Sequence, residues 1–262
     1  MEDYFGYQNK VVVVSGGGSG LGEPPCKMLV DLKAKVYVLD WAEVKVPGIE
    51  QYIHTDLSQK DSIDEAFSKI PEHIDSFFGI AGVSGLQHDF LTTVKIDLLA
   101  NKYICEEILV NRMEAGGSIA FMTSTGGYGW EKEDNKEYYL PVLEAKGYDQ
   151  AVEILKQSLF VNLPGNLGYV FSKLAMNYLV SKYQELFAAN HIRVNAVLPG
   201  STDTGLKNDF ATLTKGEDNL LKYTGYARRL ALSKEMAAPI VFLNSDMASY
   251  LSGERLIVDY GS

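Results

Sequence analysis

The sequence predicts an α/β protein built on a single doubly wound parallel sheet with helices on both faces. Three observations support this. Short apolar runs alternate with helix-like segments along the 262 residues, the first run ends in a glycine-rich turn, and we find no repeat, linker or low-complexity tract. Parallel strands need crossover connections, and helices supply them. We therefore expect one domain over residues 1–262.

Each element is predicted from its length, periodicity and bounding turn residues. The expected strands are Val11–Val14, Val36–Leu39, Ile49–His54, Ser76–Ile80, Ser118–Thr123, Ile192–Leu198 and Arg255–Val258. The expected helices are Cys26–Leu32, Ser62–Ile70, Val94–Val110, Leu167–Ala189 and Glu235–Leu243. Pro24 and Pro25 fit only the first turn of the first helix, where backbone N–H groups lack helical partners.

One segment, about residues 130–163, interrupts this alternation. It is charged over Glu131–Asp134 and then carries an expected helix at Val142–Leu159. Connections this long are uncommon and usually have a function of their own. We expect an insertion with a functional or assembly role.

Charge and composition exclude several classes of protein. The formal net charge of −10 argues against nucleic acid or an anionic membrane as the main partner, because phosphate binding needs clustered Lys and Arg. No secretory signal is visible, and no apolar run approaches the ~18 residues of a membrane span. Cys26 and Cys105 are expected to be free, buried thiols, which fits a cytoplasmic location. The four histidines lack ligand spacing, so no metal is expected.

The glycine-rich turn at residues 15–22 follows a predicted strand and opens a helix. Its residues are Ser15, Gly16, Gly17, Gly18, Ser19, Gly20, Leu21 and Gly22. Glycine lets the backbone approach a pyrophosphate, and the helix N-terminus supplies N–H groups and partial positive charge. This context predicts a dinucleotide site. Glu23 would place its charge near the phosphates, so we expect its side chain to point away.

Asp40 ends the second predicted strand, 18 residues after Gly22. A carboxylate there accepts hydrogen bonds from the adenosine ribose and repels a 2′-phosphate, so NAD(H) is favoured over NADP(H). Asp56 follows the third strand. It either contacts the adenine edge or only caps the following helix.

A Tyr-x-x-x-Lys pair places a phenol and an ammonium group on one helix face. The positive charge lowers a tyrosine pKa and favours proton exchange with a carbonyl or alcohol oxygen. Three such pairs occur, at Tyr128/Lys132, Tyr169/Lys173 and Tyr178/Lys182. The first lies in a loop, and the third faces the opposite side of the helix from the second. We select Tyr169/Lys173, which is nearer the sheet edge where ligands bind.

Taken in order, these motifs resemble the short-chain dehydrogenase/reductase family, whose sheet is Rossmann-like. Further matching segments are Asp56–Ser58, Gly79–Gly82, Ser124, Tyr169–Lys173, Arg193–Asn195, Pro199–Thr204 and Val258–Gly261. The resemblance covers nearly the whole chain and implies an oxidoreductase.

The resemblance implies a role for each matching position. Ser124 would bind the reacting oxygen, Tyr169 would be the acid/base, and Lys173 would bind ribose and tune Tyr169. Asp97 stands where the family has a catalytic Asn and can either hold a water near Lys173 or alter the proton relay. The implied cofactor-binding set is Ser15, Gly16, Gly18, Ser19, Gly20, Leu21, Gly22, Asp40, Trp41, Asp56, Leu57, Ala81, Gly82, Tyr169, Lys173, Pro199, Gly200, Thr202 and Thr204.

The long gap between Ser124 and Tyr169 is similar to that of the 3α-hydroxysteroid dehydrogenase/carbonyl reductase subgroup, where an insertion reshapes the dimer interface. A homodimer or homotetramer is thereby implied. The expected substrate wall combines an apolar lid, about residues 203–232, with Val83–Leu86 and Tyr128/Trp130. An apolar lid favours a hydrophobic alcohol or ketone such as a hydroxysteroid or bile acid. Small carbonyls, sugars, and a nucleotide-binding sensor with little turnover remain alternatives.

Overall fold

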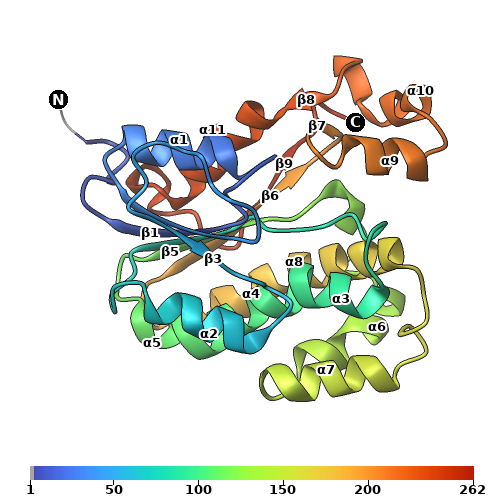
Figure 1. Ribbon diagram of the computed structural model, residues 1–262, viewed down its shortest axis with the longest axis horizontal. Coiled ribbons are helices and arrows are strands. Elements are labelled where there is room, and N and C mark those ends of the chain that lie inside the picture. The colour runs from blue at the N-terminus through green and yellow to red at the C-terminus, as the bar shows by residue number, and fades with distance from the viewer. Residues whose placement is uncertain (1–2) are drawn as a thin grey trace.

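The computed structural model describes residues 3–262, and within them the main sheet has seven strands, in the order β3-β2-β1-β4-β5-β6-β9 (Figure 1). All of its pairings are parallel. The strands are β1 (Val11–Ser15), β2 (Lys35–Asp40), β3 (Gln51–His54), β4 (Ser76–Gly79), β5 (Ser118–Met122), β6 (Arg193–Pro199) and β9 (Arg255–Val258). The order reverses between β1 and β4, so a ligand crevice is expected at the carboxyl ends of these two strands.

Helices cover both faces of the sheet, which confirms the predicted fold class. On one face lie α1 (Glu23–Asp31) and α11 (Ser233–Asn244), which pack against each other. On the other face lie α2 (Lys60–Ser68), a long helix over residues 90–112, and α8 (Gly165–Ala188) (Figure 1). Each face encloses its own apolar core, because the strands bury side chains alternately on both sides.

The long helix begins four residues earlier than expected, because the Asp89 carboxylate accepts the Thr92 N–H at 2.7 Å and caps its first turn. It comprises α3 (Phe90–Val94), α4 (Ala100–Tyr103) and α5 (Val110–Arg112), joined by π-helical turns at Lys95–Leu99 and Ile104–Leu109. Such turns occur frequently at functional sites. The first of them contains Asp97.

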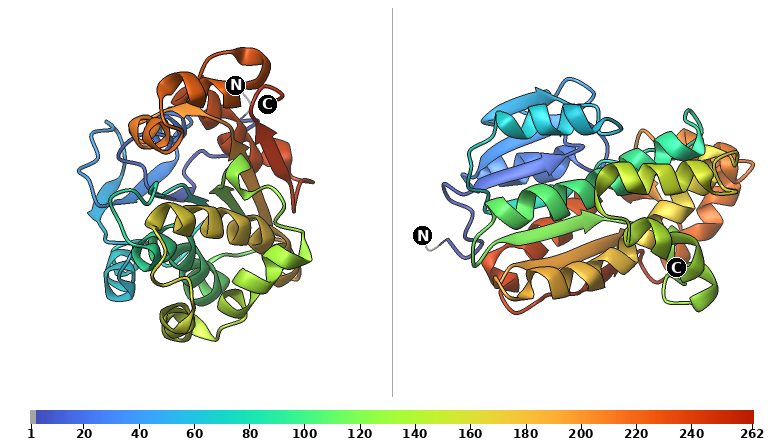
Figure 2. Two further views of the ribbon diagram at one scale, coloured as in Figure 1. Left: turned by 90° about the vertical axis from the view of Figure 1, so that its right-hand side faces the viewer. Right: turned by 90° about the horizontal axis from the view of Figure 1, so that it is seen from below.

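The insertion forms two helices, α6 (Glu133–Leu143) and α7 (Gly147–Gln157), so the expected single helix at Val142–Leu159 is wrong. The chain breaks at Gly147, whose φ of +74° cannot continue a right-handed helix. Glu133 and Asp134 of the charged stretch occupy the first turn of α6, where they complement the helix dipole. Both helices lie outside α8 and the long helix (Figure 2).

A buried ionic cluster anchors the end of α6 to the helices beneath it. Lys182 donates to the Leu143 carbonyl at 2.7 Å, and Lys102 donates to the Ala145 carbonyl at 2.9 Å. Glu106 accepts from Lys102 at 2.6 Å and from Lys182 at 3.1 Å. The carbonyls left open at the helix end are therefore satisfied by charged donors.

The segment expected as a lid carries α9 (Lys207–Leu213) and α10 (Glu217–Leu220). Its two ends are held together by the parallel pair β7 (Thr202–Asp203) and β8 (Ala231–Leu232). Both cysteines are buried, as expected. In residues 3–262, no helix is long and apolar enough to cross a membrane, and no cluster of three or more His, Cys, Asp or Glu side chains could hold a metal ion.

Candidate active site

A cavity of about 1060 Å³ lies at the carboxyl ends of the strands. It extends from the turn after β1, past the ends of β2 and β3, to the start of α8 and the lid. Most of the residues expected to bind the dinucleotide line it: Gly16, Ser19, Gly20, Leu21, Gly22, Asp40, Trp41, Asp56, Leu57, Ala81, Gly82, Tyr169, Lys173, Pro199, Gly200, Thr202 and Thr204.

The glycine-rich turn can pack closely and leave room for a dinucleotide because its glycines have no side chains. A Cβ at Gly22 would lie 2.0 Å from the Gly16 carbonyl oxygen, and one at Gly16 would lie 2.5 Å from the Ala81 Cα. Gly16 and Gly20 also have positive φ angles, +78° and +57°. The turn leads directly into the N-terminus of α1, which favours phosphate. The Glu23 carboxylate is paired with Lys27 on the helix surface, away from the cavity lining.

Asp40 is held rigidly at the end of β2. Its Oδ2 accepts the Gly18 N–H and its Oδ1 accepts the Ala42 N–H, each at 2.8 Å. Carboxylate oxygens have further lone pairs, which can accept ribose hydroxyls. Within the described chain, Ser15 and Gly18 do not line the cavity: Ser15 is buried in β1, and the Gly18 N–H is taken by Asp40.

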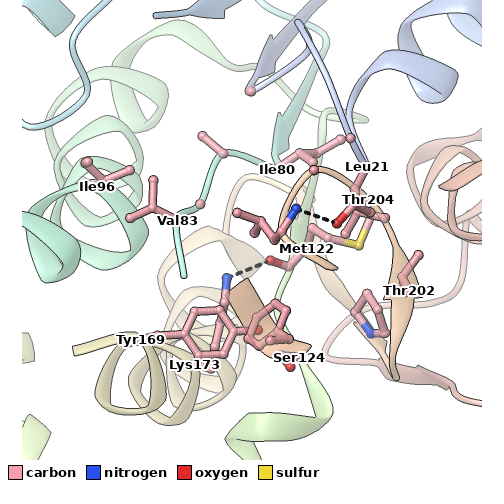
Figure 3. Close-up of a pocket in the computed structure, with 18 of the residues that line it drawn as sticks. Leu21, Ile80, Val83, Ile96, Met122, Ser124, Tyr169, Lys173, Thr202 and Thr204 are labelled. Carbon is pink, nitrogen blue, oxygen red and sulfur yellow. Dashed lines mark hydrogen bonds between the residues drawn. The ribbon is translucent and has the colours of Figure 1, made fainter. Parts of the chain in front are cut away.

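Ser124, Tyr169 and Lys173 lie together on one wall of the cavity (Figure 3). Ser124 follows β5 and accepts the Gly126 N–H at 2.9 Å. Tyr169 and Lys173 are one turn apart near the start of α8, and the Lys173 Nζ lies 5.3 Å from the Tyr169 ring centroid. The same Nζ donates to the Met122 carbonyl at 3.4 Å. A hydroxyl, a phenol and an ammonium group therefore meet beside the proposed cofactor cleft.

The other two Tyr-x-x-x-Lys pairs lie elsewhere. The Tyr128 hydroxyl donates to Asp259, and Lys182 belongs to the ionic cluster under α6. Neither pair is among the residues lining the cavity in the part of the chain that the structure describes.

Burial has the largest effect on the pKa of the Tyr169 phenol in the protein alone. Burial raises the pKa of Tyr169 to about 12, a hydrogen bond with Ser124 lowers it, and the Asp97 charge raises it further. The pKa of Tyr169 therefore shifts upward in the protein alone, opposite to the lowering expected from Lys173, because burial outweighs the other contributions. Burial also lowers the pKa of Lys173, against the pull of Asp97.

Asp97 lies behind Lys173 rather than on the cavity lining. Its Oδ1 accepts the Val83 N–H at 2.8 Å, while its Oδ2 lies 3.9 Å from the Lys173 Nζ. That Oδ2 is buried and, among residues 3–262, has no hydrogen-bond partner. Burial raises the pKa of Asp97 to about 6, although Lys173 and the Val83 N–H both lower it. A carboxyl group therefore occupies the position behind the lysine.

The lid closes over the phenol. Phe210 of α9 packs edge-on against Tyr169, with ring centroids 5.4 Å apart. The neighbouring Asp209 accepts a hydrogen bond from Ser84, which lies in the loop after β4. Lid residues on the wall are Leu206, Phe210, Leu213, Thr214, Leu220 and Tyr223.

Some residues expected on the substrate wall are elsewhere. The Tyr128 hydroxyl donates to Asp259, and the Arg255 guanidinium carbon lies over the Trp130 ring, 4.2 Å from the centroid of that ring. Neither residue lines the cavity, so their expected place on the substrate wall is wrong. His88, Thr92 and Asn166 line the cavity instead and were not anticipated. The sequence could have indicated Asn166, because it precedes Tyr169 by three residues, and residues three apart on a helix lie on the same helix face.

Comparison with known proteins supports one family. A family model described as enoyl-(acyl carrier protein) reductase matches residues 137–262. A coniferyl-alcohol dehydrogenase of Pseudomonas sp. strain HR199 is 28% identical, over 97% of this chain and 96% of that protein. A 3α-hydroxysteroid dehydrogenase of Mediterraneibacter gnavus is 28% identical, over 96% of each. The crystal structure of the 3α-hydroxysteroid dehydrogenase from Pseudomonas sp. B-0831 complexed with NADH superposes with a TM-score of 0.78, at 21% identity and 96% coverage of each chain.

The fold, the order of the motifs and these full-length relatives agree. The chain therefore resembles the short-chain dehydrogenase/reductase family along nearly its whole length, and these similarities support an oxidoreductase that acts on alcohols or carbonyl compounds.

Proposed function

We propose that this chain is an NAD(H)-dependent oxidoreductase that interconverts a secondary alcohol and a ketone. The observation that carries the proposal is a single cavity that joins the glycine turn and Asp40 to Ser124, Tyr169 and Lys173. Asp40 supports NAD(H) over NADP(H), because its fixed carboxylate repels a 2′-phosphate. The related structure from Pseudomonas sp. B-0831 was solved with NADH.

Ser124, Tyr169 and Lys173 each have a separate role in the proposed reaction. Ser124 hydrogen-bonds the reacting oxygen, and Tyr169 gives a proton to that oxygen or takes one from it. Lys173 stabilises the phenolate through its charge and binds the nicotinamide ribose. A nicotinamide held at this wall supplies the hydride donor or acceptor.

The substrate end favours an apolar molecule. Phe210, Leu213 and Leu220 cover it from the lid, and Val83 and Val170 line it from the body. Such a wall fits a hydroxysteroid, a bile acid or another hydrophobic ketone. His88, Thr92 and Asn166 provide a few polar groups that can orient a hydroxyl.

An activity screen tests the proposal. The purified chain would be assayed with steroids, bile acids, small ketones and sugars, using NADH and NADPH in parallel. We expect turnover of a hydrophobic ketone, with kcat/KM at least about tenfold higher for NADH than for NADPH. Turnover of sugars alone would overturn the proposed substrate class. NADH binding without turnover of any compound would favour a nucleotide-binding sensor, which the replacement at Asp97 motivates.

The charge at Asp97 gives a pH prediction. Because the pKa of Asp97 is about 6, it is a carboxylate above pH 7 and raises the pKa of Tyr169. Asp97→Asn removes that charge, so the phenolate forms at lower pH. The rising limb of the pH profile for alcohol oxidation should move to lower pH by on the order of one unit. Profiles that coincide would contradict a role for Asp97 in tuning Tyr169, and NADH affinity provides the control for folding.

A further inference from the structure

The second helix of the insertion reaches the far end of the cofactor cleft. The Tyr148 hydroxyl, in the first turn of α7, donates to the Ser58 carbonyl at 2.8 Å. Both residues are buried, and Ser58 belongs to the Thr55–Ser58 loop that follows β3 and lines the cavity. A helix inserted 90 residues later in the chain therefore supports one wall of the proposed adenosine pocket.

The loop that Tyr148 supports is also held by a bond from the Thr55 N–H to the Asp40 carbonyl at 2.9 Å and by local bonds. Asp56 accepts the Ser58 N–H at 2.9 Å, and Ser62 accepts the Asp56 N–H at 2.9 Å. These bonds fix the shape of the loop but leave its Ser58 carbonyl pointing into the protein. The Tyr148 hydroxyl satisfies this carbonyl in a buried setting, where an unpaired carbonyl is costly.

The Tyr148 ring is itself rigidly placed. It packs edge-on against Tyr103 of the long helix, with ring centroids 5.8 Å apart. It belongs to the same apolar core as Leu57, a residue that lines the cavity. The loop is thus joined to α7 by a hydrogen bond, and both contribute to the same apolar core.

We propose that Tyr148 is a positioning residue for the adenosine half of the dinucleotide, so that the insertion sets cofactor affinity. This inference rests on the proposed function. The Thr55–Ser58 loop follows β3, whereas Ser124 follows β5, and these strands are four positions apart in the sheet, about 19 Å. A disturbance at Ser58 should therefore weaken adenosine binding and leave the chemistry at Tyr169 unaffected.

The test compares Tyr148→Phe with Tyr139→Phe. Tyr139 is also a buried tyrosine of the insertion, and its hydroxyl donates to the Trp130 carbonyl, away from the cavity lining. Calorimetry would measure the dissociation constants of NADH and of AMP, which carries only the adenosine half. We expect Tyr148→Phe to raise both constants about three- to tenfold and Tyr139→Phe to leave them within about twofold. The kcat at saturating NADH should be retained in the Tyr148 variant.

Two results would overturn the inference while leaving the proposed function intact. One is unchanged NADH and AMP affinity in Tyr148→Phe. The other is an equal loss in both variants, which would indicate general loosening of the insertion. Failure of the unaltered chain to bind NADH would instead overturn the proposed function, and this inference with it.

Discussion

Replacing Tyr169 with phenylalanine is expected to lower kcat by about 10²–10⁴-fold while NADH affinity stays within about twofold. The substitution removes only the hydroxyl that exchanges a proton with the substrate oxygen. The ring remains to pack against Phe210 and beneath the Lys173 ammonium group. The two measurements are steady-state turnover and NADH titration by fluorescence.

Tyr178→Phe is the matched control for this experiment. Tyr178 lies on the same helix and also precedes a lysine by four residues, but it packs against Trp130 and Tyr139 in the insertion. Its substitution should leave kcat within about twofold. Unchanged turnover in Tyr169→Phe would refute the assignment of Tyr169 as the acid/base. Loss of NADH binding in this variant would indicate that the substitution had disrupted the structure of the site and not only removed the proton-transfer group.

Glu106→Ala is expected to lower the free energy of unfolding by about 3–5 kcal/mol. Its carboxylate accepts from Lys102 and Lys182, and Lys102 has a side chain only 3% exposed. Removing the acid leaves a buried ammonium group without its counter-charge. For a chain of this length the midpoint of thermal unfolding should fall by roughly 10 °C. Differential scanning calorimetry provides the measurement.

Glu65→Ala is the comparison for this prediction. Glu65 pairs with Lys69 on the surface, with side chains 71% and 43% exposed. Surface pairs of this kind contribute little, so its midpoint should shift by no more than about 1 °C. Equal shifts in the two variants would mean that the buried cluster does not anchor the insertion.

The alternation of apolar strands with amphipathic helices predicted the parallel sheet, because these patterns depend on local periodicity. All seven expected strands in the main sheet are present. The helices of the insertion were predicted less accurately. The helix that begins at Glu133 was not predicted from the sequence, and Gly147, which has a positive φ, divides the segment that was expected to be one helix.

In the candidate site, too, local features were predicted from the sequence and non-local contacts were not. The spacing of glycines in the turn and the position of Asp40 at a strand end are local features, so the sequence could predict a dinucleotide cleft there. Helical geometry separated Tyr169 from Tyr178, which point to different sides of α8. The wrong placement of Tyr128 and Trp130 on the substrate wall came from a loop, where spacing carries no direction.

The sequence by itself determined the fold class, the turn that suits a dinucleotide, and the residues to examine for proton transfer, because each follows from chain-local geometry. Tertiary structure alone decided the rest. It placed Asp97 in a buried π-helical turn behind Lys173, where burial raises the pKa of its carboxyl group to about 6. It also brought Tyr148 to Ser58, 90 residues apart. Such contacts depend on how helices pack across the sheet, and that packing has no periodic signature in the chain.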